Sequence, residues 1–236
     1  MYSTRLLLVL LVAIDVAGCA VQQHPLTATA ASSLRGRRIA TTARPPTAFF
    51  VSKPKNQVNM YGLVGGVAIA AAMSDAGARI FRENGIADPA PYMAQQLSDD
   101  LRRRYGVKLE QQSFYVADDD PTQITLLHPE TDLLLDVWIN SVSLEPLSHD
   151  PSRYHVKYIA YLRLIDARIV HLIDGTKGTV IAHGTCASIP EETPSAPTYD
   201  EFLANGAQRL KHELDRAAQS CVDVFRSKVL TAGPTP

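Results

Sequence analysis

The chain has 236 residues, of which 46% are hydrophobic and 20% charged, and its formal net charge at pH 7 is -1. This composition is ordinary for a folded protein, and the length suffices for one domain with a sizeable core. The near-neutral charge argues against a nucleic-acid-binding protein, in which Lys and Arg are normally in excess. No nucleic-acid partner is therefore expected.

Residues 1–18 predict an export signal. Met1 to Arg5 is short and carries one positive charge, and an unbroken apolar run follows from Leu6 to Ile14. This run is too short to cross a bilayer as a helix and has the length of a signal-peptide core. Val16-Ala17-Gly18-Cys19 follows, in which small residues directly precede a cysteine.

The segment Val16-Ala17-Gly18-Cys19 resembles the lipobox of bacterial lipoproteins. The resemblance implies cleavage after Gly18, a diacylglyceryl group on the sulfur of Cys19 and acylation of its new amino group. Two or three acyl chains hold a protein durably at a membrane, whereas one holds it marginally. In such lipoproteins, Ala20 in place of an aspartate favours the outer membrane, with the protein facing the periplasm. The alternative is a plain secretory signal with an incidental cysteine.

The rest of the chain divides by composition. Residues 19–36 are small and polar and predict a lipidated flexible tether. We expect residues 37–230 to form a single globular domain and residues 231–236 to be a disordered tail.

Two local clusters of arginine interrupt the balanced charge. One comprises Arg35, Arg37 and Arg38, and the other is Arg102–Arg104. The first cluster lies near the anchor, where it would meet anionic lipid. The alternative for both clusters is a solvated face.

Two cysteines remain once Cys19 is set aside. Cys186 and Cys221 would lie in a compartment that oxidises thiols, and an even remainder predicts one disulfide between them. The competing interpretation is two separate buried thiols, because a sequence cannot show that two side chains come within bridging distance.

The first half of the body predicts an extended segment and two helices. Residues 37–51 mix β-branched and aromatic residues around Pro45-Pro46, which favours an edge strand or an extended segment. A helix is expected over 62–81, and a second between Asp88, as the N-cap, and Gly106, as the left-handed stop. The second helix has an apolar stripe formed by Ala90, Ala94, Leu97, Leu101 and Tyr105.

The first of these helices carries small residues four apart, at Gly62, Gly66, Ala70 and Ser74. Such spacing admits another backbone closely and promotes helix association in membranes. A homo-oligomer or membrane insertion through Gly62, Gly66 and Ala70 is therefore one hypothesis. The alternative is a buried core helix, because the apolar part is short for a membrane span.

The second half predicts strands and then one long helix. Strands are expected over 107–116, 131–145, 153–170 and in "GTVIAHGTC", with Asp174-Gly175 beginning a hairpin turn. Thr198 and Glu201 form a capping box for a C-terminal helix. Its apolar stripe includes Cys221, and Gly206 is expected to bend it.

This order predicts an α/β protein of the α+β type. We expect a mainly antiparallel or mixed sheet of about five strands with packed helices, including the long C-terminal helix.

No motif in the sequence names a reaction. His183 with Cys186 is the nearest approach to a base and nucleophile, but an oxidised cysteine is a poor nucleophile and no third group is evident. His183-x-x-Cys186 lacks a second pair at zinc-finger spacing. The aspartates at 118–120 lack the remainder of a calcium loop and predict a turn. No catalytic residue, metal ligand or cofactor is therefore assigned.

The layout resembles that of uncharacterised bacterial envelope lipoproteins and, loosely, accessory lipoproteins of envelope transport or assembly systems. The resemblance carries no functional residue over. The expected function is a non-enzymatic binding, scaffolding or accessory module at the outer membrane, which engages a partner through a sheet edge or the groove beside the second helix. The alternative is a periplasmic enzyme or metal-binding protein.

Overall fold

The computed structural model describes residues 23–52, 62–117, 119–126, 130–168 and 178–232, with backbone only for 62–70 and 111–114. Its helices are α1 (Ala28–Ser32), α2 (Gly62–Asn84), α3 (Ala90–Tyr105), α4 (Pro121–Leu126), α5 (Tyr199–Val224) and the π-helix η2 (Phe225–Val229). Its strands are β1 (Arg38–Ala43), β2 (Phe49–Val51), β3 (Lys108–Tyr115), β4 (Leu133–Pro146), β5 (Tyr154–Asp166) and β6 (Thr179–Ser188).

All six strands form one mixed sheet in the order β3-β1-β4-β5-β6, with β2 also paired to β4. Strand β1 runs parallel to both β3 and β4, β2 is parallel to β4, and β4, β5 and β6 are antiparallel. The predicted α+β class, with a sheet and a long C-terminal helix, is confirmed. Strand β1 is internal rather than at an edge, because Pro45 and Pro46 lie outside the strands, in the β1–β2 connection.

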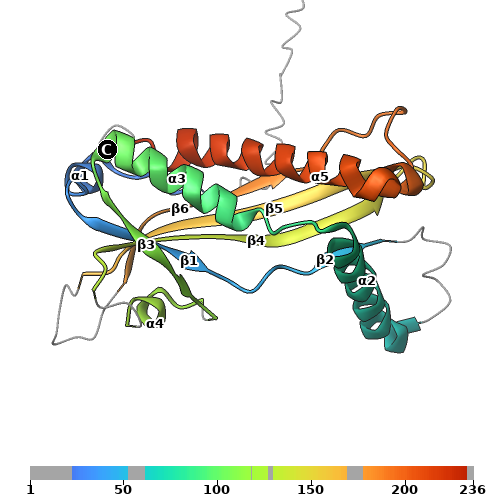
Figure 1. Cartoon of the computed structure of the whole chain (residues 1–236), viewed down its shortest axis with the longest axis horizontal. Helices are drawn as coiled ribbons and strands as arrows, with labels where there is room; N and C mark the ends of the chain where they lie inside the picture. Colours follow the sequence, from blue (N-terminus) through green and yellow to red (C-terminus); the bar gives the residue numbers. More distant parts are fainter. Residues whose placement is uncertain (1–22, 53–61, 118, 127–129, 169–177, 233–236) are drawn as a thin grey trace, which may run out of the picture.

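Helices α3 and α5 cover one face of the sheet, and the short helix α4 lies on the other face near one end (Figure 1). The main core lies between the sheet and the α3–α5 layer, and it includes Leu97, Leu135, Tyr158, Leu210 and Phe225. A smaller core lies beneath α4, where Ile124 packs with the outward side chains Leu134 and Ile165. The sequence predicted a turn at the start of α4 and did not predict this helix.

The predicted end of α3 at Gly106 and the predicted capping box of α5 are confirmed, whereas α3 begins one residue later than predicted, with Pro89 rather than Asp88 as its N-cap. Asp88 Oδ1 accepts a hydrogen bond from the Ala90 N–H (2.9 Å), and Gly106 ends α3 with φ 69°. Thr198 and Glu201 form the capping box of α5. The expected bend at Gly206 is a break, because residues 204–207 all leave the helical conformation. Both helices turn the predicted apolar stripes toward the core, although Tyr105 at the end of α3 is only partly buried.

Cys186 of β6 and Cys221 of α5 are joined by a disulfide, with their Cα atoms 5.4 Å apart. Both residues are buried, at 3% and 0% exposed. The bond therefore holds the long helix against the sheet at a point inside the main core.

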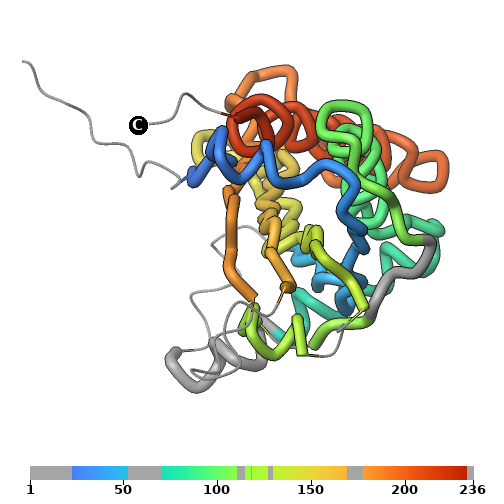
Figure 2. Tube along the Cα trace, turned by 90° about the vertical axis from the view of Figure 1, so that its left-hand side faces the viewer, coloured from blue at the N-terminus to red at the C-terminus, as the bar shows by residue number. Residues whose placement is uncertain are grey.

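The N-terminal part of the described chain packs against the body, so the prediction of a flexible tether is wrong for residues 23–36. His24 forms two backbone hydrogen bonds with His183 (2.8 and 3.0 Å), and their rings stack. Leu26 is fully buried, and its N–H donates to the Val229 carbonyl (2.8 Å). Figure 2 shows this segment beside the C-terminal end of the described chain. Composition could not reveal this packing, because the partners lie far along the chain.

Helix α2 extends from the opposite end of the molecule and packs against β2 (Figure 1). Gly77 sits where the helix crosses the strand. A Cβ atom at this position would lie 1.7 Å from the Phe49 carbonyl oxygen. Only glycine allows this approach of the two backbones.

Gly77→Ala is expected to lower the free energy of unfolding by about 2 kcal/mol. The added Cβ would force α2 away from β2, which outweighs the gain in helix propensity of about 1 kcal/mol. Urea denaturation followed by circular dichroism measures the change. Asp75→Ala, at an exposed position of the same helix, is the control and should stay within about 0.5 kcal/mol of the wild type. A Gly77→Ala protein as stable as the wild type would contradict the prediction.

Candidate functional site

The candidate site begins at a gap in the sheet between β1 and β4. Strand β1 pairs with β4 only as far as Thr41 and Leu135, and β2 resumes the pairing at Phe49 and Val142. Between these points, no strand in the described part of the chain pairs with residues 136–141 of β4 on the edge that faces away from β5. Prolines 45 and 46 explain the gap, because they have no N–H to continue a ladder.

Side chains bridge the gap in place of a backbone ladder. The Thr42 hydroxyl donates to Asp136 Oδ1 (2.6 Å), and Arg44 Nε donates to the same oxygen (2.8 Å). The Thr47 hydroxyl donates to the carbonyl of Ile139. The β1–β2 connection is therefore attached to β4 at both ends of the gap.

Two neighbouring cavities that share lining residues lie on the helix side of this gap, and we call them together the groove. The larger has a volume of 610 Å³ and lies between β1 and α3, with Ala94, Gln95 and Ser98 on the helix side. The smaller has a volume of 340 Å³ and lies beneath the junction of α2 and α3. Both are lined by Thr47, Asp88 and Ile139. These volumes are typical of ligand-binding sites in proteins.

The smaller cavity is mainly apolar and holds few polar groups. Phe81, Ile86, Val142 and Leu214 contribute apolar walls, and Tyr158 lines the inner side. Tyr158 is fully buried, and its hydroxyl donates to the sulfur of Met93 (3.6 Å). Burial, with a smaller effect from the negative charge of Asp88, raises the Tyr158 pKa far above its usual range. The phenol therefore stays neutral.

Asp88 is the titratable group at the meeting point of the two cavities. Partial burial raises the pKa of its carboxyl, and the hydrogen bond from the Ala90 N–H opposes that rise. A carboxylate held in a poorly solvated place gains more from a hydrogen-bond donor on a ligand than an exposed one does. Asp88 is therefore suited to accept a hydrogen bond from a group bound in the groove.

The larger cavity has a mixed lining of apolar, polar and charged side chains, and its charges are balanced. Arg44 and Arg102 contribute the positive charges, and Asp88 and Glu110 the negative ones. Uncharged donors and acceptors, among them threonine, serine and glutamine side chains, lie between these residues. This arrangement suits a ligand with both donors and acceptors and little net charge.

A cluster of ion pairs centred on Asp136 of β4 adjoins the groove, because Arg44 belongs to both. Asp136 is fully buried and is bonded by Arg44 (Nη2–Oδ2, 2.9 Å) and Arg163 (Nη2–Oδ2, 2.6 Å). Both guanidinium groups also lie over the ring of Trp138, at 4.6 and 4.8 Å from its centroid, and Trp138 stacks on Tyr161. Burial alone would raise the Asp136 pKa, but the hydrogen bonds from Arg44 and Thr42 hold it below its ordinary value.

The sequence-predicted candidates for catalysis do not assemble into an active site. Cys186 is bonded to Cys221 and is not a free thiol, and His183 stacks on His24. Within the described segments, no group of three or more His, Cys, Asp or Glu side chains could hold a metal ion.

The predicted lipidation site and the predicted association stripe lie outside what the structure describes. Cys19 precedes the first described residue, and the side chains of Gly62, Gly66 and Ala70 are not described. In the described part of the chain, no helix is long and apolar enough to cross a membrane. Of the predicted disordered tail, residues 233–236 also lie outside it, but the prediction is wrong for Thr231 and Ala232, which form hydrogen bonds with Arg104 and Tyr105 (2.8 and 3.1 Å).

The groove residues could not be assigned as a site from the sequence. Asp88 was predicted only as a helix cap, and the groove arises where β1 diverges from β4, which depends on pairings between distant segments. The Pro45-Pro46 pair is the one local signal, because it predicts an interruption of pairing.

Comparison with known proteins adds no functional information. No family model matches the chain, and no curated protein matches its sequence. The chain is similar to a solved structure, that of the hypothetical protein CT253 from Chlamydia trachomatis, with a TM-score of 0.33 and 10% sequence identity. The similarity covers 82% of this chain and 97% of that one. A likeness at this level carries no argument about the site.

Proposed function

We propose that this protein is a lipid-anchored component of the bacterial envelope, held at the outer membrane and facing the periplasm, whose body is a non-enzymatic binding module. The resemblance of Val16-Ala17-Gly18-Cys19 to a lipobox supports the anchor, and Ala20 supports the outer membrane. The Cys186–Cys221 disulfide supports an oxidising compartment, because such bonds are rare where thiols are kept reduced.

The groove between β1 and α3 is the binding site in this proposal, and its ligand is an extended, partly apolar segment of another envelope protein. The observation that carries this choice is the lining of the two cavities. The 610 Å³ cavity offers donors and acceptors with balanced charge, which matches the alternating N–H and C=O groups of a peptide backbone. The adjoining 340 Å³ cavity has apolar walls that fit an apolar side chain of the same segment.

Asp88 would accept a hydrogen bond from the bound segment where the two cavities meet. A small anionic ligand fits less well, because Arg44 already bonds to Asp136 and Asp119 and because Asp88 and Glu110 add negative charge. The balanced lining therefore favours a peptide over a phosphate or a nucleotide.

Site-specific crosslinking in the host cell tests this proposal. A photoreactive residue in place of Gln95, which is exposed on α3 and lines the groove, should yield a defined adduct with one envelope protein. The matched position is Gln123, which is exposed on α4 on the other face of the sheet and should not yield that adduct. Asp88→Asn should weaken binding of the captured segment about tenfold, because it removes a charge-assisted hydrogen bond.

Asp88→Asn is expected to leave the fold intact, so that a loss of capture reports on the groove. The side-chain carbonyl of asparagine can accept the same hydrogen bond from the Ala90 N–H that Asp88 accepts. Because burial raises the Asp88 pKa, the folded state favours the protonated carboxyl, and its ionisation at neutral pH costs folding free energy that asparagine avoids. Equal adduct yields from Gln95 and Gln123, or capture insensitive to Asp88→Asn, would refute the groove as the binding site.

A further inference from the structure

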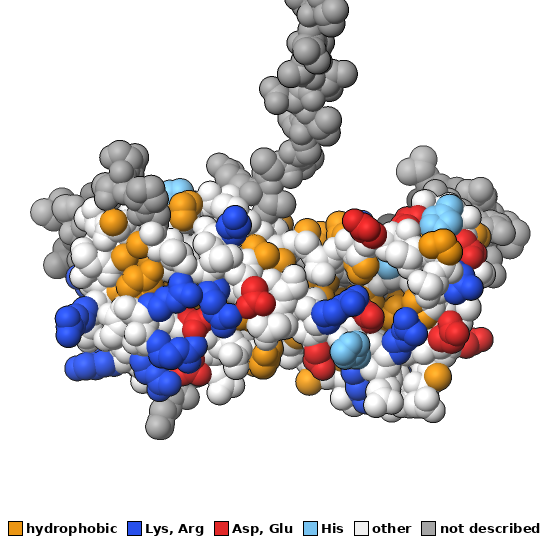
Figure 3. All heavy atoms as spheres, turned by 90° about the horizontal axis from the view of Figure 1, so that it is seen from above, with side chains coloured by type: hydrophobic (Ala, Val, Ile, Leu, Met, Phe, Trp, Pro, Cys, Tyr) orange, Lys and Arg blue, Asp and Glu red, His pale blue; other side chains and the backbone are white. Residues whose placement is uncertain are grey.

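Six basic side chains from three segments gather at the end of the molecule where α3 and η2 finish. We name this group the basic end. It comprises Arg35, Arg102, Arg103, Arg104, Arg226 and Lys228. Figure 3 shows Lys and Arg side chains concentrated at this end, whereas charges of both signs mix at the opposite end. All are exposed except Arg226, which is half-buried.

The fold brings these segments together through specific contacts. The Gly36 N–H donates to the Gly106 carbonyl (3.0 Å), which places Arg35 beside the end of α3. Arg104 Nη1 donates to the Thr231 hydroxyl (2.8 Å), just beyond η2. Of the first arginine cluster, only Arg35 belongs to the basic end. Arg37 is buried against Asp166 (2.5 Å), and Arg38 pairs with Glu110 and Asp132 (3.8 and 3.7 Å).

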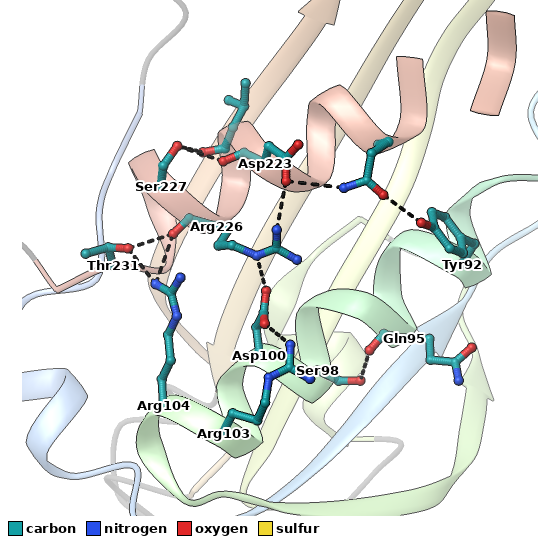
Figure 4. A network of polar contacts seen from close by, with 12 residues as sticks. Tyr92, Gln95, Ser98, Asp100, Arg103, Arg104, Asp223, Arg226, Ser227 and Thr231 are labelled. Carbon is teal, nitrogen blue, oxygen red and sulfur yellow. Dashed lines mark hydrogen bonds and ion pairs between the residues drawn. The ribbon is translucent and has the colours of Figure 1, made fainter. Parts of the chain in front are cut away.

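The charges at the basic end are only partly neutralised. Buried Asp100 pairs with both Arg103 and Arg226, and Asp223 also pairs with Arg226, as Figure 4 shows. Asp99 pairs with Arg102 (2.8 Å). The remaining three cations, Arg35, Arg104 and Lys228, have no carboxylate partner among the residues that the structure describes.

Helix dipoles do not account for this surplus. The carboxyl ends of α3 and η2 each carry roughly half a negative elementary charge, so together they offset about one positive charge. The basic end has three more cations than carboxylates. A net positive charge of about two therefore remains at the solvent-exposed surface of the basic end, where it would attract an anionic partner.

The packed N-terminal segment keeps the basic end close to the predicted anchor. Leu26 bonds to Val229, the neighbour of Lys228. Cys19 lies seven residues before Leu26 in the sequence, and a fully extended chain of that length spans at most about 25 Å. A lipidated Cys19 would therefore hold η2 within this distance of the membrane surface.

We infer that the basic end lies against anionic phospholipid head groups of the membrane that carries the anchor. This inference rests on the proposed lipid anchor. A basic segment attracts an anionic membrane surface within about one Debye length, roughly 8 Å at physiological salt, and the short connection allows that approach. Arg102 belongs to both the basic end and the groove, so the groove opens near the membrane surface.

Lysine acylation of the native, lipidated protein tests the orientation without any substitution. The protein is reconstituted into vesicles of phosphatidylcholine alone, or of phosphatidylcholine with phosphatidylglycerol, and a small water-soluble acylating reagent is added. Lys228 should react about fivefold more slowly in the anionic vesicles, and high salt should restore its reactivity. Lys211, midway along α5 and outside the basic end, is the internal control and should react equally in both.

The possible outcomes test the inference about the basic end separately from the proposed lipid anchor. Equal reactivity of Lys228 in both kinds of vesicle would overturn the inference, while the anchor itself is read from the intact mass. If that mass shows no acyl chains, flotation of the unlipidated protein with the same vesicles at low salt decides the question. Binding to anionic vesicles alone, weakened about tenfold by the double variant Arg35→Gln and Arg104→Gln, supports the basic end. Failure to bind overturns it.

Discussion

Asp136→Asn is expected to lower the free energy of unfolding by about 3 kcal/mol or more. The Asp136 carboxylate is fully buried and forms hydrogen bonds with Thr42, Arg44 and Arg163. Asparagine keeps the shape of the side chain but removes the charge, so two half-buried guanidinium groups lose their shared counterion. Such an uncompensated charge costs far more than the net benefit of the intact pair.

The loss of stability in Asp136→Asn should depend on pH, and the direction follows from the Asp136 pKa. The hydrogen bonds from Arg44 and Thr42 outweigh the effect of burial and place the Asp136 pKa in the folded protein below its ordinary value. The stabilisation is therefore fully present above the ordinary aspartate pKa of about 4 and is lost as the pH falls through the lower, folded-state pKa. The difference between wild type and Asp136→Asn should accordingly be largest near neutral pH and should shrink in acid.

Urea denaturation of both proteins at several pH values measures this effect. Asp215→Asn is the control, because this aspartate is exposed on α5, and it should change stability by less than about 0.5 kcal/mol at every pH. A small, pH-independent loss in Asp136→Asn would show that the two arginines find solvent or other partners when the carboxylate is removed. The β4 wall of the groove would then not depend on the ion cluster.

The elements that the sequence predicts best are those specified by neighbouring residues. Gly106 ends α3, and Thr198 with Glu201 begins α5, because caps act within one turn of the helix. The Cys186–Cys221 pairing is also predictable from the sequence, because only two cysteines remain after Cys19. The fold confirms it by placing their Cα atoms within bridging range.

What the sequence does not predict depends on contacts between distant segments. Leu26 and Leu34 are isolated apolar residues in a polar stretch, yet both are fully buried. The Leu26 N–H donates a hydrogen bond to the carbonyl of Val229, which is far along the chain. The groove has the same origin, since it exists only because β1 and β2 meet β4 at two separated registers. The sequence carries no local signal for the packing of Leu26, and for the groove it carries only Pro45-Pro46, which predicts an interruption of pairing but not the cavity beside it.

Reduction of the Cys186–Cys221 disulfide is expected to lower the free energy of unfolding by about 4 kcal/mol. The bond links residues 35 apart in sequence, and closing a loop of that length restricts the unfolded chain by this amount in the chain-entropy model. Cys186 and Cys221 are both buried in the main core between β6 and α5, and we expect them to stay packed there after reduction, so that the folded state changes little. The effect should therefore arise mainly from the unfolded state.

Denaturation with and without reductant measures this difference. The double variant Cys186→Ala and Cys221→Ala should be insensitive to reductant and no more stable than the reduced wild type, since alanine also leaves space in the core. Equal stability of oxidised and reduced wild type would mean that the core alone holds α5 on the sheet.

The same bond tests the proposed compartment independently of the anchor. Intact mass before and after reduction and alkylation should show that Cys186 and Cys221 gain alkyl groups only after reduction in protein purified from its host's membranes. A first residue of Cys19 carrying acyl chains would support both the anchor and the periplasmic address. An oxidised pair with an unmodified Cys19, or with the chain cut elsewhere, would indicate a secreted protein without an anchor. Cysteines that are alkylated without reduction would contradict export, because the cytoplasm keeps thiols reduced.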